Sequence, residues 1–398
     1  MPFRMAEEKP VANIKVIGVG GGGSNAIDTM VQNRLKGVEF IVANTDLQAL
    51  EKSKADVRLQ LGPGITKGMG AGADPEKGKD SAQESYEDIQ RALKGADMTF
   101  ITAGLGGGTG TGAAPIIAKL SKEIGALTVA VVTKPFYFEA KRRMRNAEAG
   151  WEALKSHVDT IITIPNDRLL GIMQKNSTLI EMMHMVDDVL LQAVKGITDL
   201  INLPGHINVD FADLKTVMKE VGPAIMGSGS ASGENRATEA AKRAIDNQLL
   251  EDVGIDGAKG VLINISATEE SLTMGEFMEA SSLIQEKAND DANIIIGALF
   301  DNALEDELRV TVIATGLSTY DDSETISTLE MGRNSGLLGK PEQNRNDKTN
   351  KTSEMKTVHF AKPNPKPRGT TLPPPIFDNN DHERHDLEEP AYIRKKAN

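Results

Sequence analysis

The chain has 398 residues, of which 39% are apolar, 26% are charged and only 4% are aromatic. This length suits about two domains plus tails, and the composition is typical of a globular protein. The net charge of −12 disfavours a nucleic-acid partner, and the lack of cysteine excludes disulfides and thiolate metal sites. The first residues show no apolar signal segment and the longest apolar runs are strand-sized, so we expect a cytoplasmic protein without direct membrane insertion.

Residues 11–178, which follow a flexible N-terminus at 1–10, alternate between strand-like and helical segments. The strand-like segments are "NIKVIGV", "VEFIVANTD", "MTFITAG", "LTVAVVT" and "TIITIP", and most are almost continuously apolar. Such strands, separated by helical patterns, predict a Rossmann-like α/β domain whose parallel sheet is covered on both faces.

A long amphipathic helix is predicted at about 177–203, because apolar residues recur there at steps of three and four. The stripe consists of Ile180, Met183, Val186, Leu190, Val194, Ile197 and Ile201. Residues 204–320 then predict an α+β domain, with strands in "GAKGVLINIS", "ANIIIGALF" and "LRVTVIATG". Residues 321–386 are rich in polar residues and proline and predict a disordered linker.

Two glycine-rich loops each follow a strand and precede a helix. The first, "GVGGGGSNA", fits the dinucleotide pattern Gly18-x-Gly20-x-x-Gly23, with Asp46 placed where an NAD site would use an acid. The second is "GLGGGTGTG" at 104–112, where Thr109 and Thr111 add hydroxyl groups. A dinucleotide needs one such loop, whereas a triphosphate can be held between two helix N-termini. No P-loop pattern is present, so backbone N–H groups and helix dipoles would bind the phosphates.

These loops, with the motifs that follow them, resemble the tubulin/FtsZ family of GTPases. The resemblance covers most of residues 11–318 and includes "VANTDLQAL", "GMGAGADPEKG", "VVTKPFYFEAKRR", "TIPNDRLL" and "PGHINVDFADLKTVM". It implies a GTPase that polymerises into the division-site ring of bacteria. It also implies which residues bind GTP or GDP: Gly21, Gly22, Gly23, Ser24, Asn25, Ala71, Gly72, Ala73, Gly108, Thr109, Gly110, Glu139, Arg143 and Asn166. Glu139 and Arg143 are also spaced as a helical i,i+4 ion pair.

Asp187 lies beside the apolar stripe of the long helix, where a carboxylate without a partner is costly. Guanine presents two adjacent N–H donors, and a carboxylate can accept from both. The alternative is a partly exposed acid at the edge of the stripe. With the resemblance, we expect Asp187 to read guanine and Met183, where the family often has phenylalanine, to lie against the base.

Asp210 and Asp213 stand three residues apart at the start of a predicted helix and so share a face. On local grounds they could simply stabilise the helix N-terminus. The resemblance instead implies that this loop enters the active site of the next subunit, where Asp210 and Asp213 orient the attacking water with help from Asn208. Subunits would then stack head to tail into filaments. Mg²⁺ would be held mostly through phosphates and water, without a dedicated set of protein ligands.

The last residues, 387–398, read "LEEPAYIRKKAN" and break the pattern of the linker. We expect a partner-binding peptide that recruits membrane-tethering adaptors and division regulators through Pro390, Ala391, Tyr392, Ile393, Arg394 and Lys395. Two alternatives to the GTPase remain at this point. One is an NAD-dependent dehydrogenase, and the other is a scaffold that polymerises with nucleotide but does not hydrolyse it.

Overall fold

The computed structural model describes residues 12–171, 177–202, 209–219, 222–246 and 255–317. Ten strands form one continuous sheet in the order β3-β2-β1-β4-β5-β6-β7-β10-β8-β9. The strands are β1 Ile14–Val19, β2 Val38–Asn44, β3 Val57–Gln60, β4 Met98–Gly104, β5 Leu127–Lys134, β6 Thr160–Pro165, β7 Gly222–Ser232, β8 Gly260–Ala267, β9 Asn293–Phe300 and β10 Glu307–Thr315.

The strands from β3 to β7 are parallel, which confirms the predicted α/β class. Strand β10 runs antiparallel to β7 and β8, and β8 pairs in parallel with β9. The order reverses at β1, since β2 and β3 lie on one side of it and β4 to β6 on the other. Ligands of open α/β sheets bind at such a reversal, outside the carboxyl ends of the strands.

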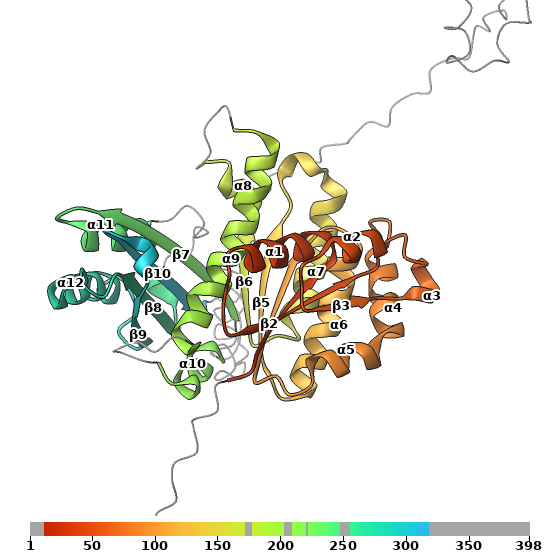
Figure 1. The fold of residues 1–398 in the computed structure, drawn as a ribbon, viewed down its shortest axis with the longest axis horizontal. Coiled ribbons are helices and arrows are strands. Elements are labelled where there is room, and N and C mark those ends of the chain that lie inside the picture. Colours follow the sequence, from red (N-terminus) through yellow and green to blue (C-terminus); the bar gives the residue numbers. More distant parts are fainter. Residues whose placement is uncertain (1–11, 172–176, 203–208, 220–221, 247–254, 318–398) are drawn as a thin grey trace, which may run out of the picture. The chain divides into compact units, whose positions relative to one another are not determined.

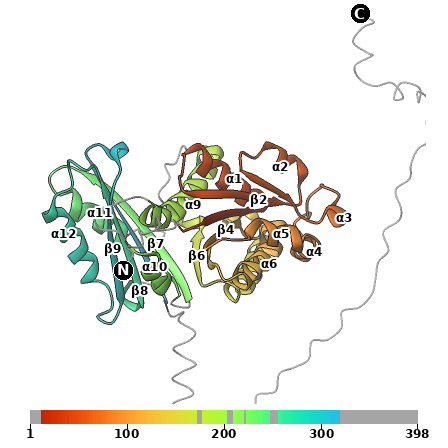
Figure 2. The ribbon, with the colours of Figure 1, turned by 60° about the horizontal axis from the view of Figure 1, so that its bottom comes forward.

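Strands β1 to β6 form the first region of the sheet, and β7 to β10 form the second region. Helices cover both faces of the first region, as Figure 2 shows with α1 and α2 on one face and α4, α5 and α6 on the other. The long helix α9 packs with α1 on the first face, in a core with β1, β4 and β5. The helices are α1 Gly20–Gln32, α2 Leu47–Lys52, α3 Pro63–Thr66, α4 Pro75–Glu84, α5 Tyr86–Leu93, α6 Thr109–Glu123, α7 Lys141–Lys155, α8 Asn166–Leu169, α9 Leu179–Asn202, α10 Phe211–Met218, α11 Arg236–Ile245 and α12 Met274–Gln285. Three short 3-10 turns complete the elements: η1 Tyr137–Glu139, η2 Ile255–Gly257 and η3 Asn302–Leu304.

Helix α9 confirms the predicted amphipathic helix, but its first turns differ from the prediction. Ile180 is 70% exposed and Met183 is 41% exposed, whereas Val186, Leu190 and Val194 are buried. The buried part of the stripe contacts both the first sheet region and residues of β7, β8 and β10 such as Met226, Leu262 and Ile313. Helix α9 lies between the two regions of the chain (Figure 1), and one hydrophobic core contains residues of both regions.

Candidate functional site

The two glycine loops lie side by side at the reversal of strand order. Strands β1 and β4 are paired in parallel with Val19 opposite Ala103, so the helices that follow them begin at the same edge of the sheet. Helix α1 begins at Gly20 and α6 at Thr109, so both helices begin inside the glycine loops that the sequence places before them. The glycines of the first loop are thus the first turn of α1, and two helix N-termini with unpaired backbone N–H groups meet here.

Glycine is required where the loops touch. Gly20 has φ +72°, and a Cβ added there would lie 2.8 Å from Gly110 N. A Cβ on Gly108 would lie 2.8 Å from the Ala71 side chain and 2.9 Å from Asp74 N. Both distances are shorter than side chains tolerate, so the first loop, the second loop and the segment around Ala71 pack backbone against backbone. By contrast, a Cβ on Gly21 would meet no described atom within 4 Å.

The hydroxyl groups around the loops are engaged in different ways. Ser24 Oγ is buried and donates to Gly20 O at 2.8 Å, while Asn25 is exposed. Thr111 Oγ1 accepts from Gly106 N at 2.9 Å, so Thr111 braces the second loop rather than facing outward. Thr109 Oγ1 lies 2.6 Å from Thr45 Oγ1.

Glu139 and Arg143 form an ion pair of 2.7 Å, but they do not lie on one helix. Glu139 ends η1, Ala140 has φ +83°, and α7 begins at Lys141. The Glu139 carboxylate also accepts from Phe136 N at 2.9 Å, which fixes the turn.

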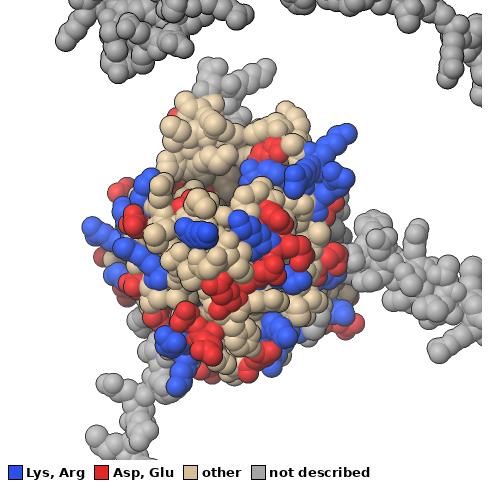
Figure 3. Space-filling model, turned by 90° about the vertical axis from the view of Figure 1, so that its right-hand side faces the viewer, with Lys and Arg blue, Asp and Glu red and all other residues tan. Residues whose placement is uncertain are grey.

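The first turn of α7 is strongly basic and contains no acid. Its exposed cations Lys141, Arg142, Arg143 and Arg145 stand where the helix dipole disfavours positive charge. Figure 3 shows the side of the molecule that lies to the right in Figure 1. Near its top, Lys and Arg side chains gather on one wall of a hollow. An anionic ligand beside this turn would offset the unfavourable charge.

Asn166 is the first residue of α8, directly after the carboxyl end of β6. It is 7% exposed, and its Oδ1 has no hydrogen-bond partner in the described part of the chain. A buried amide oxygen without a donor costs about 1–3 kcal/mol. Asn166 therefore offers an unused acceptor at the carboxyl end of β6.

Asp187 is half-buried on α9, one turn after Met183 on the same face. Burial raises the pKa of its carboxyl to about 6; nearby His184 opposes the shift, and the carboxylates of Asp188 and Asp28 add to it. Asp187 forms no hydrogen bond or ion pair with another described residue. Its half-buried position agrees with an acceptor that waits for ligand donors.

Asp210 and Asp213 lie far from the glycine loops. Helix α10 ends at the opposite edge of the sheet, where Thr160 Oγ1 at the start of β6 donates to Met218 O and Thr315 Oγ1 donates to Val217 O. Figure 1 places α10 at the lower end of the molecule, away from α8. Asp210 precedes α10 but makes no side-chain capping bond, which weakens the interpretation of a cap. Asn208 and the peptide residues 390–395 lie outside the described residues.

Sequence reasoning missed the end of β2, where Asn44 and Thr45 contact both glycine loops. Asn44 Nδ2 donates to Ser24 Oγ at 3.5 Å, and Asn44 is 3% exposed. The available signal was the polar run "NTD" directly after an apolar strand. Asp46 of that run caps α2, because its Oδ1 accepts from Gln48 N and Ala49 N.

Comparisons with known proteins match this geometry. The description "Tubulin/FtsZ family, GTPase domain" matches residues 13–174, and "FtsZ family, C-terminal domain" matches residues 222–318. A "Cell division protein FtsZ" from Coxiella burnetii (strain RSA 493 / Nine Mile phase I) is 49% identical over 395 residues, 99% of each chain. One from Pseudomonas aeruginosa is 56% identical over 306 residues, 77% of each chain.

Solved structures of the same family have a similar fold. The structure described as "FtsZ dimer, empty (M. jannaschii)" has a TM-score of 0.74 and 46% identity, and the match covers 77% of this chain and 88% of that one. CetZ2 from Haloferax volcanii, in a GTPgS-bound protofilament, has a TM-score of 0.65 at 20% identity over 81% of this chain and 98% of that one, which shows the shared fold alone.

These matches rule out the dehydrogenase alternative, since the two glycine loops lie within the matched GTPase domain. The chain belongs to the Tubulin/FtsZ family, carries its guanine-nucleotide-binding GTPase domain, and groups with the cell-division proteins of that family.

Proposed function

We propose that this protein binds GTP across the carboxyl ends of β1 and β4 and hydrolyses it only between stacked subunits. Residues 21–25, 71–73 and 108–110 would surround the phosphates with backbone N–H groups, as two adjacent helix N-termini favour. Glu139, Arg143 and Asn166 would bind the rest of the nucleotide. Asp187 would accept from guanine while Met183 lies against the base.

One observation carries the proposal. The two acids Asp210 and Asp213 stand at the start of α10, a helix that ends at the edge of the sheet opposite the glycine loops. They cannot act on a nucleotide bound to their own chain, but in a head-to-tail stack they would face the nucleotide of the neighbour. With Asn208, they would orient the attacking water, because phosphoryl transfer depends on positioning and electrostatics. The dimeric M. jannaschii relative supports self-assembly of this chain.

Mg²⁺ would be bound mainly by phosphate oxygens and water. The described residues contain no group of three or more His, Cys, Asp or Glu side chains arranged to hold a metal ion. The ion would neutralise the β- and γ-phosphates, and the chain's own residues would supply the backbone donors around it.

The proposed domains are a GTP-binding domain at 11–178, the central helix at 179–203 and an α+β domain at 204–320. Residues 321–386 would link them to the terminal peptide 387–398, which would bind adaptors that tether filaments to the membrane at the division site. Among the described helices, none has the length and apolar character that a membrane span requires.

The test measures phosphate release against protein concentration for the wild type and for Asp213→Asn. We expect a concentration threshold for the wild type, and for the variant unchanged GTP binding with turnover lowered about 10²–10⁴-fold. Asp290→Asn, at an exposed acid on the loop before β9, is the matched control and should behave as wild type. Turnover that is proportional to concentration with no threshold would show that each subunit acts alone. A chain that polymerises with GTP but releases no phosphate would support the scaffold alternative.

A further inference from the structure

Thr45 is completely buried where three loops of the site meet. It directly follows β2, and its carbonyl oxygen accepts from Gly70 N at 3.1 Å and from Thr66 Oγ1 at 3.2 Å. Its hydroxyl oxygen lies 2.6 Å from Thr109 Oγ1 in the second glycine loop. One residue therefore links the second loop to the backbone that leads into residues 71–73.

The hydroxyl groups of Thr45 and Thr109 carry one proton that has no acceptor among the described residues. Two hydroxyl groups carry two protons, and the bond between Thr45 and Thr109 places only one of them. Among the described residues, no third group accepts from either hydroxyl. A buried polar proton without an acceptor costs about 1–3 kcal/mol. The second proton therefore requires an acceptor that the described chain does not supply.

The position of Thr109 identifies the kind of acceptor. Thr109 is 9% exposed and is the first residue of α6, beside the backbone N–H groups of the second loop. Thr45 is fully buried and cannot touch a ligand itself. An oxygen that meets Thr109 at a helix N-terminus is favoured when it carries negative charge, as a phosphate oxygen does.

We propose that Thr45 is a positioning residue for the phosphates of GTP. Its hydroxyl donates to Thr109 Oγ1, and this leaves the proton of Thr109 directed toward a phosphate oxygen. The bond from Thr45 to Thr109 strengthens the bond from Thr109 to the phosphate, because a hydroxyl that accepts a hydrogen bond becomes a better donor. The Thr45 carbonyl meanwhile holds Gly70, so both phosphate segments are set by one residue. The identity of the ligand rests on the proposed function.

A second buried hydroxyl pair provides the comparison. Thr128 Oγ1 at the start of β5 donates to Ser121 Oγ at 2.8 Å, and Ala126 O lies 3.1 Å away as a further acceptor. Thr128 is as buried as Thr45, but its hydroxyl is satisfied inside the fold and lies outside the glycine loops. Thr128→Val therefore makes the same chemical change at a site with a purely structural role.

The experiment measures GTP affinity, turnover and unfolding of the nucleotide-free protein for Thr45→Val, Thr45→Ser and Thr128→Val. We expect Thr45→Val to weaken GTP binding about tenfold, because Thr109 loses the hydrogen bond that directs its proton and strengthens it as a donor to the phosphate. Thr45→Ser keeps the hydroxyl and should restore most of the affinity. Thr128→Val should lower resistance to denaturant as much as Thr45→Val does, with unchanged GTP affinity.

A double-mutant cycle with Thr109→Val tests whether Thr45 acts through Thr109. We expect the double variant to bind GTP no more weakly than Thr109→Val alone. Additive losses, or wild-type affinity in Thr45→Val, would overturn this proposal while the wild-type chain still binds GTP. If the wild-type chain itself fails to bind GTP, the proposed function fails as well, so the two failures are distinguishable.

Discussion

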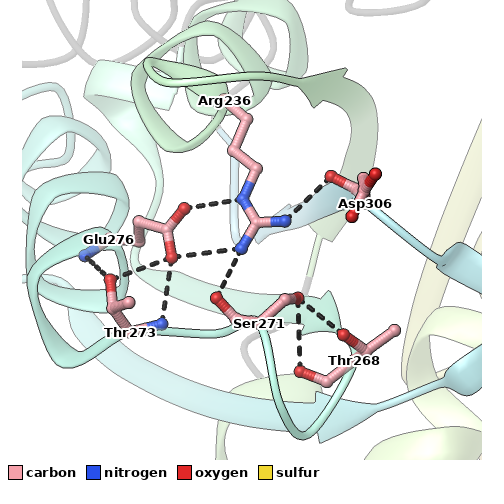
Figure 4. A network of polar contacts seen from close by, with 6 residues as sticks. All are labelled: Arg236, Thr268, Ser271, Thr273, Glu276 and Asp306. Atoms are coloured by element: carbon pink, nitrogen blue, oxygen red, sulfur yellow. Dashed lines mark hydrogen bonds and ion pairs between the residues drawn. The ribbon is translucent and has the colours of Figure 1, made fainter.

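The polar groups of Asn166 after β6 and of Arg236 on α11 are used in opposite ways. At the carboxyl edge of β1, β4 and β6, the Asn166 oxygen and one proton of the Thr45–Thr109 pair have no partner among the described residues. In the second region, Arg236 of α11 is almost fully satisfied, as Figure 4 shows. Its guanidinium donates to Glu276 Oε1 at 2.6 Å, to Ser271 O at 2.6 Å and to Asp306 O at 2.8 Å. We propose that the first arrangement serves a ligand, whereas the second stabilises the fold.

The largest expected effect breaks the satisfied network. Arg236→Met should lower the free energy of unfolding by about 3–5 kcal/mol, because it leaves the Glu276 carboxylate without its buried partner. The hydrogen bond from Arg236 first, and those from Thr273, hold the pKa of Glu276 down to about 2. This group therefore stabilises the fold above pH 4.5, and that stabilisation is lost as the pH falls toward 2.

Chemical denaturation and a GTP titration check this prediction together. The matched control is Arg243→Met on the same helix, whose pair with Glu239 is exposed and contributes about 0–1 kcal/mol. GTP affinity in conditions where Arg236→Met is folded should equal that of the wild type. An equal loss in both properties would mean that the network also serves the ligand site.

The next largest effect is expected on the choice of nucleotide at Asp187. Asp187→Ala should reduce the preference for GTP over ATP about 10–100-fold, as expected when a charged acceptor is removed from two donors. Asp188→Ala is the control, because Asp188 is the exposed neighbour on the same helix. Competition binding of the two nucleotides gives the ratio. A preference that survives in Asp187→Ala would assign guanine recognition to other residues.

The pH dependence of GTP binding follows from the same carboxyl. Burial raises the pKa of Asp187 to about 6, so the acceptor is ionised above that pH and protonated below it. GTP affinity should then fall about fivefold between pH 6 and pH 5, in step with the ionised fraction of Asp187. Asp187→Asn should abolish this dependence, and Asp188→Asn should retain it. The stability of the nucleotide-free protein should change in the opposite direction. Because the pKa of Asp187 is raised by folding, this group makes the nucleotide-free protein more stable as the pH falls from 6 toward the ordinary pKa of the carboxyl.

The smallest effect lies on α9. Asp199, with its side chain 10% exposed, faces a cavity of about 30 Å³ that Asn264 also lines, and burial raises the pKa of its carboxyl to about 6, against the attraction of Lys195. Asp199→Asn should change the free energy of unfolding at pH 7 by less than about 1 kcal/mol, since Lys195 keeps its 3.3 Å pair with Asp301. The variant should also show a weaker gain in stability from pH 7 to pH 5. A large loss at pH 7 would show that the Asp199 charge is needed.

Most of the first region could be predicted, because its strands are continuous apolar runs and its loops are marked by glycine. Strand β7 was missed because "GPAIMGSGSAS" is rich in small residues. Those residues are small because α11 packs closely on the strand: a Cβ on Gly229 would lie 2.6 Å from Ala244 N. Strand β3 was missed because it is a four-residue edge strand with little apolar character.

The site was predictable only in part, for a similar reason. Glycine loops and paired acids leave patterns in the sequence. The partner of the Thr45 hydroxyl, in contrast, depends on how the loops pack. Thr45 meets Thr109, which lies 64 residues further along the chain. The acid after β2 looked like a ribose ligand but caps a six-residue helix instead.

Helix α9 has a consequence for how the molecule melts. Its buried face is part of a single core with β1 and β4 on one side and with β7, β8 and β10 on the other. Neither region can release α9 without exposing apolar surface of the other, so the two should unfold in one cooperative transition. A cut after α9 should therefore expose apolar residues of β7, β8 and β10 that this helix covers, although the family descriptions divide the chain near that point.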